Sequence, residues 1–135
     1  MCTSIIATLL TVLLATGTTS SIADDDIAHA AEVTVLSSNL ANGATTGEWG
    51  FSAMVQTADH CTLFDAGRFT DTVVNNAEAL QIDLGCVRNI VLSHFHFDHT
   101  SGLASVVAKI RASGYAGQLN VYVGQGFFTC ESSPW

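Results

Sequence analysis

Six consecutive residues, His94-Phe95-His96-Phe97-Asp98-His99, place three imidazoles and one carboxylate in a single short segment. The whole chain of 135 residues holds 5 histidines, so more than half of them fall in this segment. Imidazole nitrogens and carboxylate oxygens are the ligands that zinc and similar divalent metals take in proteins. A solvated polar loop is the ordinary alternative, but so dense a cluster favours a metal site.

The segment lies between a predicted strand and a predicted helix. The apolar run Val87–Leu92 is typical of a strand that is buried on both faces. After the segment, Thr100 or Ser101 is a suitable helix cap. The apolar residues of that helix then recur at helical spacing, at Leu103, Val106, Val107 and Ile110. We expect Phe95 and Phe97 to face the core and to hold the segment rigid.

The spacing of the polar residues divides them into two pairs. His94 and His96 are two apart in an extended segment, so they project to the same side and can contact one ion. Asp98 and His99 come where the chain turns into the helix, so they point elsewhere. We therefore expect this second pair to contact a second ion nearby.

The remaining chain predicts a layered α/β domain. Alternation over Glu32–Ser37 indicates a strand, and Trp49–Thr57 and Cys61–Phe64 indicate a hairpin joined by a short polar turn. The stretch Asp71–Leu80 has helical periodicity, and Leu119–Val123 reads as a last strand. This order of elements predicts helices packed against a mixed sheet.

The N-terminus has the pattern of a secretory signal. Residues 5–15 are almost all apolar and are followed by small residues, with cleavage expected after Ala23 or after Ala30. The apolar run is too short to span a bilayer, so we expect no stable membrane span. No Lys or Arg precedes it, and a buried N-terminal helix is the alternative. We therefore expect a signal peptide over residues 1–23, a domain over 32–135, and a secreted or periplasmic protein.

The charge balance disfavours nucleic acid as a partner. The formal net charge is −8, and the fixed cations are only Arg68, Arg88, Lys109 and Arg111. A surface that follows a phosphate backbone needs clustered Lys and Arg. A small-molecule substrate fits this chain better.

Four cysteines allow little cross-linking. Cys2 lies inside the expected signal, which leaves Cys61, Cys86 and Cys130 and at most one disulfide within the chain. No pair has the spacing of a zinc finger. We expect these cysteines to be buried or free thiols.

The pattern HxHxDH after an apolar strand resembles the metallo-β-lactamase superfamily. Upstream, EWGFSA at residues 48–53, LFDAG at 63–67 and NNAEALQIDL at 75–84 extend the likeness, which covers about residues 33–125. They are similar to a branch of exported metallo-hydrolases and to dihydropterin–aminobenzene phosphate synthase-like proteins. Glu48 opens the first of these motifs, and the sequence assigns it no role.

The resemblance implies the N-terminal half of an αββα sandwich, in which a mixed sheet is flanked by helices. It implies that His94 and His96 are ligands of a first metal, and that Asp98 and His99 are ligands of a second. It also implies that Asp65, in the LFDAG turn, orients one of these ligands from behind.

The activity implied by the resemblance is metal-dependent hydrolysis. One or two zinc ions, with iron or manganese as the alternative metals, would activate water for attack on an ester, lactam, lactone or thioester. Asp98 would be the catalytic residue that orients this water. An iron-dependent oxidation or a group transfer within the same superfamily is the second hypothesis.

The C-terminal part lacks what the resemblance requires. Family members are longer, and their second half supplies further histidines and a bridging acid. After His99 this chain has no histidine, and its only acid is Glu131. We therefore expect a C-terminally truncated fragment that by itself is inactive or at most a weak metal-binding module. Half a sandwich would also expose one sheet face, so we expect instability or self-association.

Overall fold

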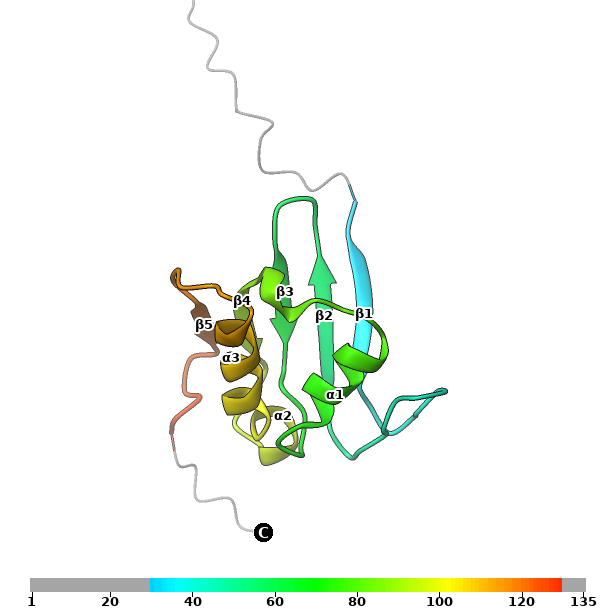
Figure 1. Cartoon of the computed structure of the whole chain (residues 1–135). Coiled ribbons are helices and arrows are strands. Elements are labelled where there is room, and N and C mark those ends of the chain that lie inside the picture. The colour runs from blue at the N-terminus through cyan, green and yellow to red at the C-terminus, as the bar shows by residue number, and fades with distance from the viewer. Residues whose placement is uncertain (1–29, 130–135) are drawn as a thin grey trace, which may run out of the picture.

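The computed structural model describes residues 30–129 and contains one mixed sheet with the strand order β1-β2-β3-β4-β5. Figure 1 shows the helices α1 and α3 on the same side of this sheet. The predicted signal peptide over residues 1–23 lies outside the described residues, as do Cys130 and Glu131.

The strands confirm the predicted mixed sheet. Strands β1 to β3 are antiparallel neighbours, whereas β3, β4 and β5 run parallel. The bounds are Glu32–Ser37 for β1, Ser52–Gln56 for β2, Cys61–Phe64 for β3, Val87–Leu92 for β4 and Asn120–Val123 for β5. The two predicted strands of the hairpin, β2 and β3, pair with each other as expected, although β2 begins three residues later than its alternation suggested.

The helices match the predicted positions, with two short additions. Helix α1 spans Thr72–Ala79 and α3 spans Leu103–Ala112, as the apolar spacing predicted. The additions are the 3-10 helix η2, Leu84–Cys86, and the single turn α2, Phe97–Thr100. Within residues 30–129 no helix has the length and apolar character required to cross a membrane.

The predicted capping of α3 is wrong. Its N-cap is Gly102, and no side chain caps this helix. Thr100 belongs instead to the preceding turn α2, where its Oγ1 donates to the carbonyl oxygen of His96 at 2.9 Å. The extra turn moves the start of α3 along the chain, beyond both Thr100 and Ser101.

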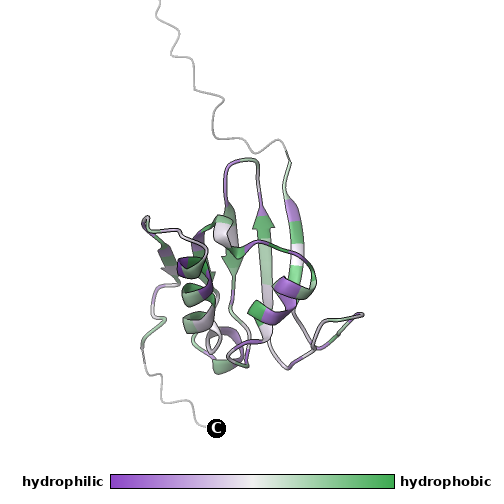
Figure 2. Cartoon of the chain, viewed as in Figure 1, coloured by the Kyte–Doolittle hydropathy of each residue, from purple (hydrophilic) through white to green (hydrophobic). Residues whose placement is uncertain are grey.

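The core lies between the helices and one face of the sheet. Met54, Leu63 and Ile90 lie side by side on β2, β3 and β4, and each is at most 2% exposed. From the helices, Val73, Ala77, Val106 and Ile110 join the same cluster. Each large apolar side chain buried here stabilises the fold by about 1.5–3 kcal/mol. Figure 2 shows hydrophobic residues on the strands and, interspersed with hydrophilic ones, on α1 and α3.

The second face of the sheet carries an apolar row that is exposed at three of its five positions. Register places Val35, Ala53, Phe64, Val91 and Tyr122 side by side across the five strands. Of these, Val35 is 50%, Phe64 37% and Tyr122 53% exposed. Among the described elements, α1 and α3 cover only the opposite face (Figure 1). This row is called the bare face below.

A disulfide joins Cys61 to Cys86, with 5.3 Å between their Cα atoms. The prediction of free or buried thiols is therefore wrong for these two residues. The reason lies in the sheet: Cys61 pairs with Val87 in the parallel β3–β4 ladder, which brings the preceding Cys86 beside it. Sequence spacing alone could not show this, because the pairing of β3 with β4 is not a local feature.

Candidate metal centre

The histidine-rich segment lies at the carboxyl end of β4, beside the turn that follows β3. Ser93 to His96 form a bent stretch, not the extended one predicted: the His96 N–H donates to the His94 carbonyl at 3.1 Å, and α2 starts directly afterwards at Phe97. Parallel strands bring their carboxyl ends to the same edge of a sheet, and such edges are common ligand sites in α/β proteins. The turn after β3 contains Asp65, so the topology brings this acid next to the segment.

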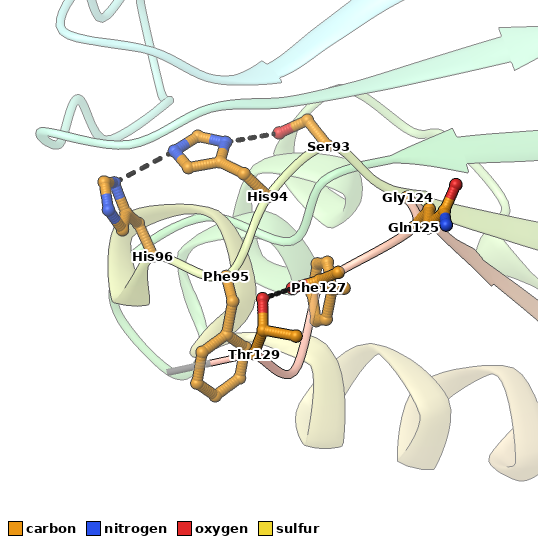
Figure 3. Close-up of a pocket in the computed structure, with 9 residues that line it drawn as sticks. Ser93, His94, Phe95, His96, Gly124, Gln125, Phe127 and Thr129 are labelled. Carbon is orange, nitrogen blue, oxygen red and sulfur yellow. Dashed lines mark hydrogen bonds between the residues drawn. The ribbon is translucent and has the colours of Figure 1, made fainter. Parts of the chain in front are cut away.

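The side chains of His94 and His96 converge. His94 Nε2 lies 3.0 Å from His96 Nδ1, and His94 Nδ1 lies 2.9 Å from Ser93 Oγ (Figure 3). One of these two facing imidazole nitrogens donates its N–H and the other accepts through its lone pair, so a metal ion would have to replace this hydrogen bond. The rings share one side of the segment, as their spacing predicts, while their role as ligands stays a prediction.

Asp98 and His99 lie close to this pair rather than apart from it. His99 Nε2 lies 3.7 Å from Asp98 Oδ2, and the ring centroids of His94 and His99 are 4.2 Å apart. The four predicted ligands thus form one cluster at the end of β4. Within residues 30–129, however, no three His, Cys, Asp or Glu side chains are grouped so that they could hold one ion.

Asp65 lies directly behind His99. It is 1% exposed, and its Oδ2 lies 2.7 Å from His99 Nδ1. Its carboxylate also accepts two hydrogen bonds from Ser93, from the backbone N–H to Oδ1 and from Oγ to Oδ2, at 2.7 and 2.8 Å. An ionised carboxylate only accepts, so His99 must donate from Nδ1, which leaves Nε2 free for a metal. These are the contacts that the predicted orienting role requires.

The predicted packing of Phe95 and Phe97 is wrong. Their side chains are 62% and 60% exposed, so they do not hold the segment against the core. Backbone hydrogen bonds do so instead: Phe51 N–H donates to the Asp98 carbonyl at 3.2 Å, and Ala66 N–H donates to the His99 carbonyl at 2.8 Å. The segment lies past the end of the sheet, where the helices no longer provide a core.

Glu48 is the residue near this centre whose role the sequence did not assign. Its side chain is 5% exposed and accepts from Ser37 Oγ at 2.6 Å and from the backbone N–H groups of Arg68 and Phe69, both at 2.8 Å. Burial raises the pKa of this carboxyl, but the hydrogen bonds, from Ser37 first, outweigh it and hold the pKa below the ordinary 4.5. Glu48 thereby fixes the turn that follows Asp65.

Two glycines allow this turn to pack closely. Gly67 has a φ of +72°, and a Cβ added there would collide with Glu48 Oε1. A Cβ added at Gly102 would collide with the carbonyl oxygen of Ala66. The glycine of the LFDAG motif is therefore matched to the glutamate of the EWGFSA motif. The only sequence signal for this contact was the presence of both motifs.

The donor atoms suit a divalent metal in type but are few in number. Imidazole and carboxylate groups fit zinc, and they also suit iron and manganese. Catalytic zinc generally has three protein ligands and one open position. Each of the pairs His94–His96 and Asp98–His99 supplies two, so either ion would need further ligands.

The metallo-beta-lactamase superfamily model matches residues 47–133. This match covers most of the chain and contains Glu48, Asp65 and the histidine-rich segment. The chain therefore belongs to the metallo-beta-lactamase superfamily, as the motifs predicted.

The fold matches part of larger solved structures. The short form of human tRNase Z is 23% identical, with a TM-score of 0.55 over 67% of this chain and 34% of that chain. The metallo-beta-lactamase fold protein YhfI from Bacillus subtilis is 21% identical, with a TM-score of 0.52 over 73% of this chain and 39% of that chain. At these identities the likeness concerns the fold alone.

A curated relative matches a shorter stretch. The 7,8-dihydropterin-6-methyl-4-(beta-D-ribofuranosyl)-aminobenzene-5'-phosphate synthase of Methanocaldococcus jannaschii is 38% identical over 48 residues, or 36% of this chain. The match spans only 16% of that synthase. The chain thus corresponds to a small part of this relative.

Proposed function

We propose that this chain is part of a metal-dependent hydrolase that uses zinc. The observation that carries the proposal is the contact between His99 Nδ1 and Asp65 Oδ2, 2.7 Å, next to the facing rings of His94 and His96. Buried carboxylates that fix the tautomer of a histidine are the usual support of a metal ligand.

In the proposed mechanism, His94 and His96 would hold a first ion, and Asp98 and His99 would hold a second. When bound, divalent ions supply an acidified water and a Lewis acid for a carbonyl oxygen. Asp65 keeps His99 in the tautomer whose Nε2 is free. Asp98, which is 15% exposed, would accept a hydrogen bond from the attacking water at its carboxylate and so orient the nucleophile.

The proposed reaction is the hydrolysis of an ester, lactam, lactone or thioester. Water adds to the carbonyl carbon, the bond from this carbon to oxygen, nitrogen or sulfur breaks, and the leaving group takes up a proton. The products are a carboxylic acid and an alcohol, amine or thiol, without any change of oxidation state.

We also propose that the protein is exported and acts on a small molecule. The Cys61–Cys86 disulfide supports export, because disulfides persist in oxidising compartments. N-terminal sequencing of protein from the extracellular or periplasmic fraction should find a mature chain that starts after Ala23 or Ala30. The net charge of −8 supports a small-molecule substrate over nucleic acid.

The function is tested by an assay of the zinc-loaded protein against a panel of esters, lactams, lactones and thioesters. Both the 135-residue chain and the longest product of the open reading frame that contains it are assayed. We expect hydrolysis by a complete product and its loss in His94→Ala and Asp98→Asn, while His60→Ala, in the exposed β2–β3 turn, retains activity. Metal analysis of the same samples distinguishes zinc from iron. Finding iron would support the group-transfer or oxidation hypothesis. A fully active, metal-free protein would contradict the proposal.

A further inference from the structure

A groove of about 410 Å³ lies directly beside the candidate metal centre. Its walls come from the histidine-rich segment and from the stretch that follows β5, which are brought together only by the fold (Figure 3). Among the residues that line it are Ser93, His94, His96, Gln125, Phe127 and Thr129. None of the residues that line it is an Asp, Glu, Lys or Arg.

One wall of the groove is aromatic. The rings of Phe95 and Phe127 meet edge to face, with centroids 5.3 Å apart, and both residues line the groove. Phe128 extends the cluster, at 5.0 Å from Phe127. Phe95 is 62% exposed, although apolar aromatic surface is normally buried. Figure 3 draws the Phe95 ring on the other side of the segment from the two imidazoles, so Phe95 and Phe127 offer a stacking surface within the groove but away from them.

The stretch after β5 is held in shape by its own hydrogen bonds. Phe127 N–H donates to the Gly124 carbonyl at 3.2 Å, and Thr129 donates to the Gly126 carbonyl from N–H at 2.8 Å and from Oγ1 at 2.6 Å. Gly126 has a φ of +83°, which lets the chain reverse beside the groove. Because this wall is already formed, little ordering would oppose ligand binding.

We propose that the groove binds a neutral substrate that carries an aromatic ring. The ring packs against Phe95 and Phe127, and the rest of the substrate extends along the groove, which His94 and His96 also line. Gln125 can hydrogen-bond a polar substituent at the far end of the groove. That the ligand is a substrate rests on the proposed hydrolase function. The aromatic selectivity of the groove does not depend on a metal.

The metal-free test is an NMR titration of the chain with benzamide, with isobutyramide as the non-aromatic comparison. We expect benzamide to shift the amide signals of Gly124 and Gly126 and to bind more tightly than isobutyramide. Edge-to-face ring contacts typically contribute enough for a roughly 2- to 12-fold change in affinity. Phe95→Ala and Phe127→Ala should each remove this preference, whereas Phe69→Ala, an exposed ring outside the groove, should retain it.

Phe127 also packs against the core, so its replacement can affect folding. Phe95→Ala removes a mostly exposed ring and keeps the test decisive. Equal binding of the two amides, or shifts spread over the bare face around Val35 and Phe64, would overturn the inference.

A second arm separates this inference from the proposed function. Zinc chloride is added to the benzamide-free chain, and the imidazole signals of His94 and His96 are followed. Zinc-dependent shifts without benzamide selectivity would leave the hydrolase proposal intact and overturn the groove. Benzamide selectivity without any zinc response would support the groove and contradict the hydrolase proposal.

Discussion

Asp65 and His99 are 34 residues apart in the sequence, yet Asp65 Oδ2 lies 2.7 Å from His99 Nδ1. The contact joins the end of β3 to the turn α2 and determines which nitrogen of His99 faces the candidate metal centre. Asp65→Asn should therefore lower zinc affinity by about 10- to 100-fold, because an amide cannot accept all of the hydrogen bonds that this carboxylate accepts. Nitrogen NMR of the His99 ring should show a mixture of tautomers in the variant. An unchanged tautomer together with unchanged zinc affinity would remove the orienting role.

The buried Glu48 should make stability depend on acid pH. Its pKa is lower in the folded chain than its ordinary 4.5, so its ionised form stabilises the fold above that pH. This stabilisation is lost as the pH falls through the lower, folded-state pKa. Glu48→Gln should cost about 1.5–3 kcal/mol of unfolding free energy at pH 7 and should flatten the pH dependence below 4.5. Urea unfolding from pH 3 to 7 checks this, with the exposed Glu78→Gln as the control. A pH dependence that is identical in both variants would contradict it.

The Cys61–Cys86 disulfide closes a loop that contains Asp65 and all of α1. For a sequence separation of 25 residues, chain entropy alone gives a stabilisation of about 3.5 kcal/mol. The double variant Cys61→Ala/Cys86→Ala should lose stability of that order in urea unfolding. Peptide mapping without reductant should first find the two cysteine peptides linked. Finding either of them linked to Cys130 instead would show that the pairing is wrong.

The bare face should cause self-association, in line with the expectation for half of a sandwich. Val35 lies within strand β1, belongs to the bare face and is 50% exposed. The substitution Val35→Lys therefore places a charge where a second copy would pack. Sedimentation velocity should show concentration-dependent association of the unchanged chain and clear weakening in the variant. Leu40→Lys, in an 85% exposed loop position, serves as the control. A monodisperse monomer that melts cooperatively would count against this prediction.

The sequence predicted the order of strands and helices because apolar periodicity is a local property. Val73 and Ala77 in α1, and Val106 and Ile110 in α3, mark the faces that the helices bury. The convergence of His94 with His96 was predicted from alternation in an extended segment, but the segment is bent at His94 and Phe95, with the His96 N–H donating to the His94 carbonyl.

What the sequence could not provide depends on strand pairing and on surface geometry. The Cys61–Cys86 bond and the Glu48 hydrogen bonds to Arg68 and Phe69 exist only because β1, β2, β3 and β4 come together. Phe95 was assigned to the core because apolar side chains usually are, but its segment lies beyond the end of the sheet. There, the backbone contacts of Asp98 and His99 hold the chain in place.

The central claim is that His94, His96, Asp98 and His99 bind divalent metal. The most direct measurement is a zinc titration of the full chain that follows all assigned histidine ring signals by NMR, alongside His94→Ala and the matched control His60→Ala. The account predicts saturable shifts at His94, His96 and His99, absent at His60, that weaken in His94→Ala and persist in His60→Ala. Zinc shifts that are equal at His60 and at the cluster, or that are unaffected by His94→Ala, would contradict it.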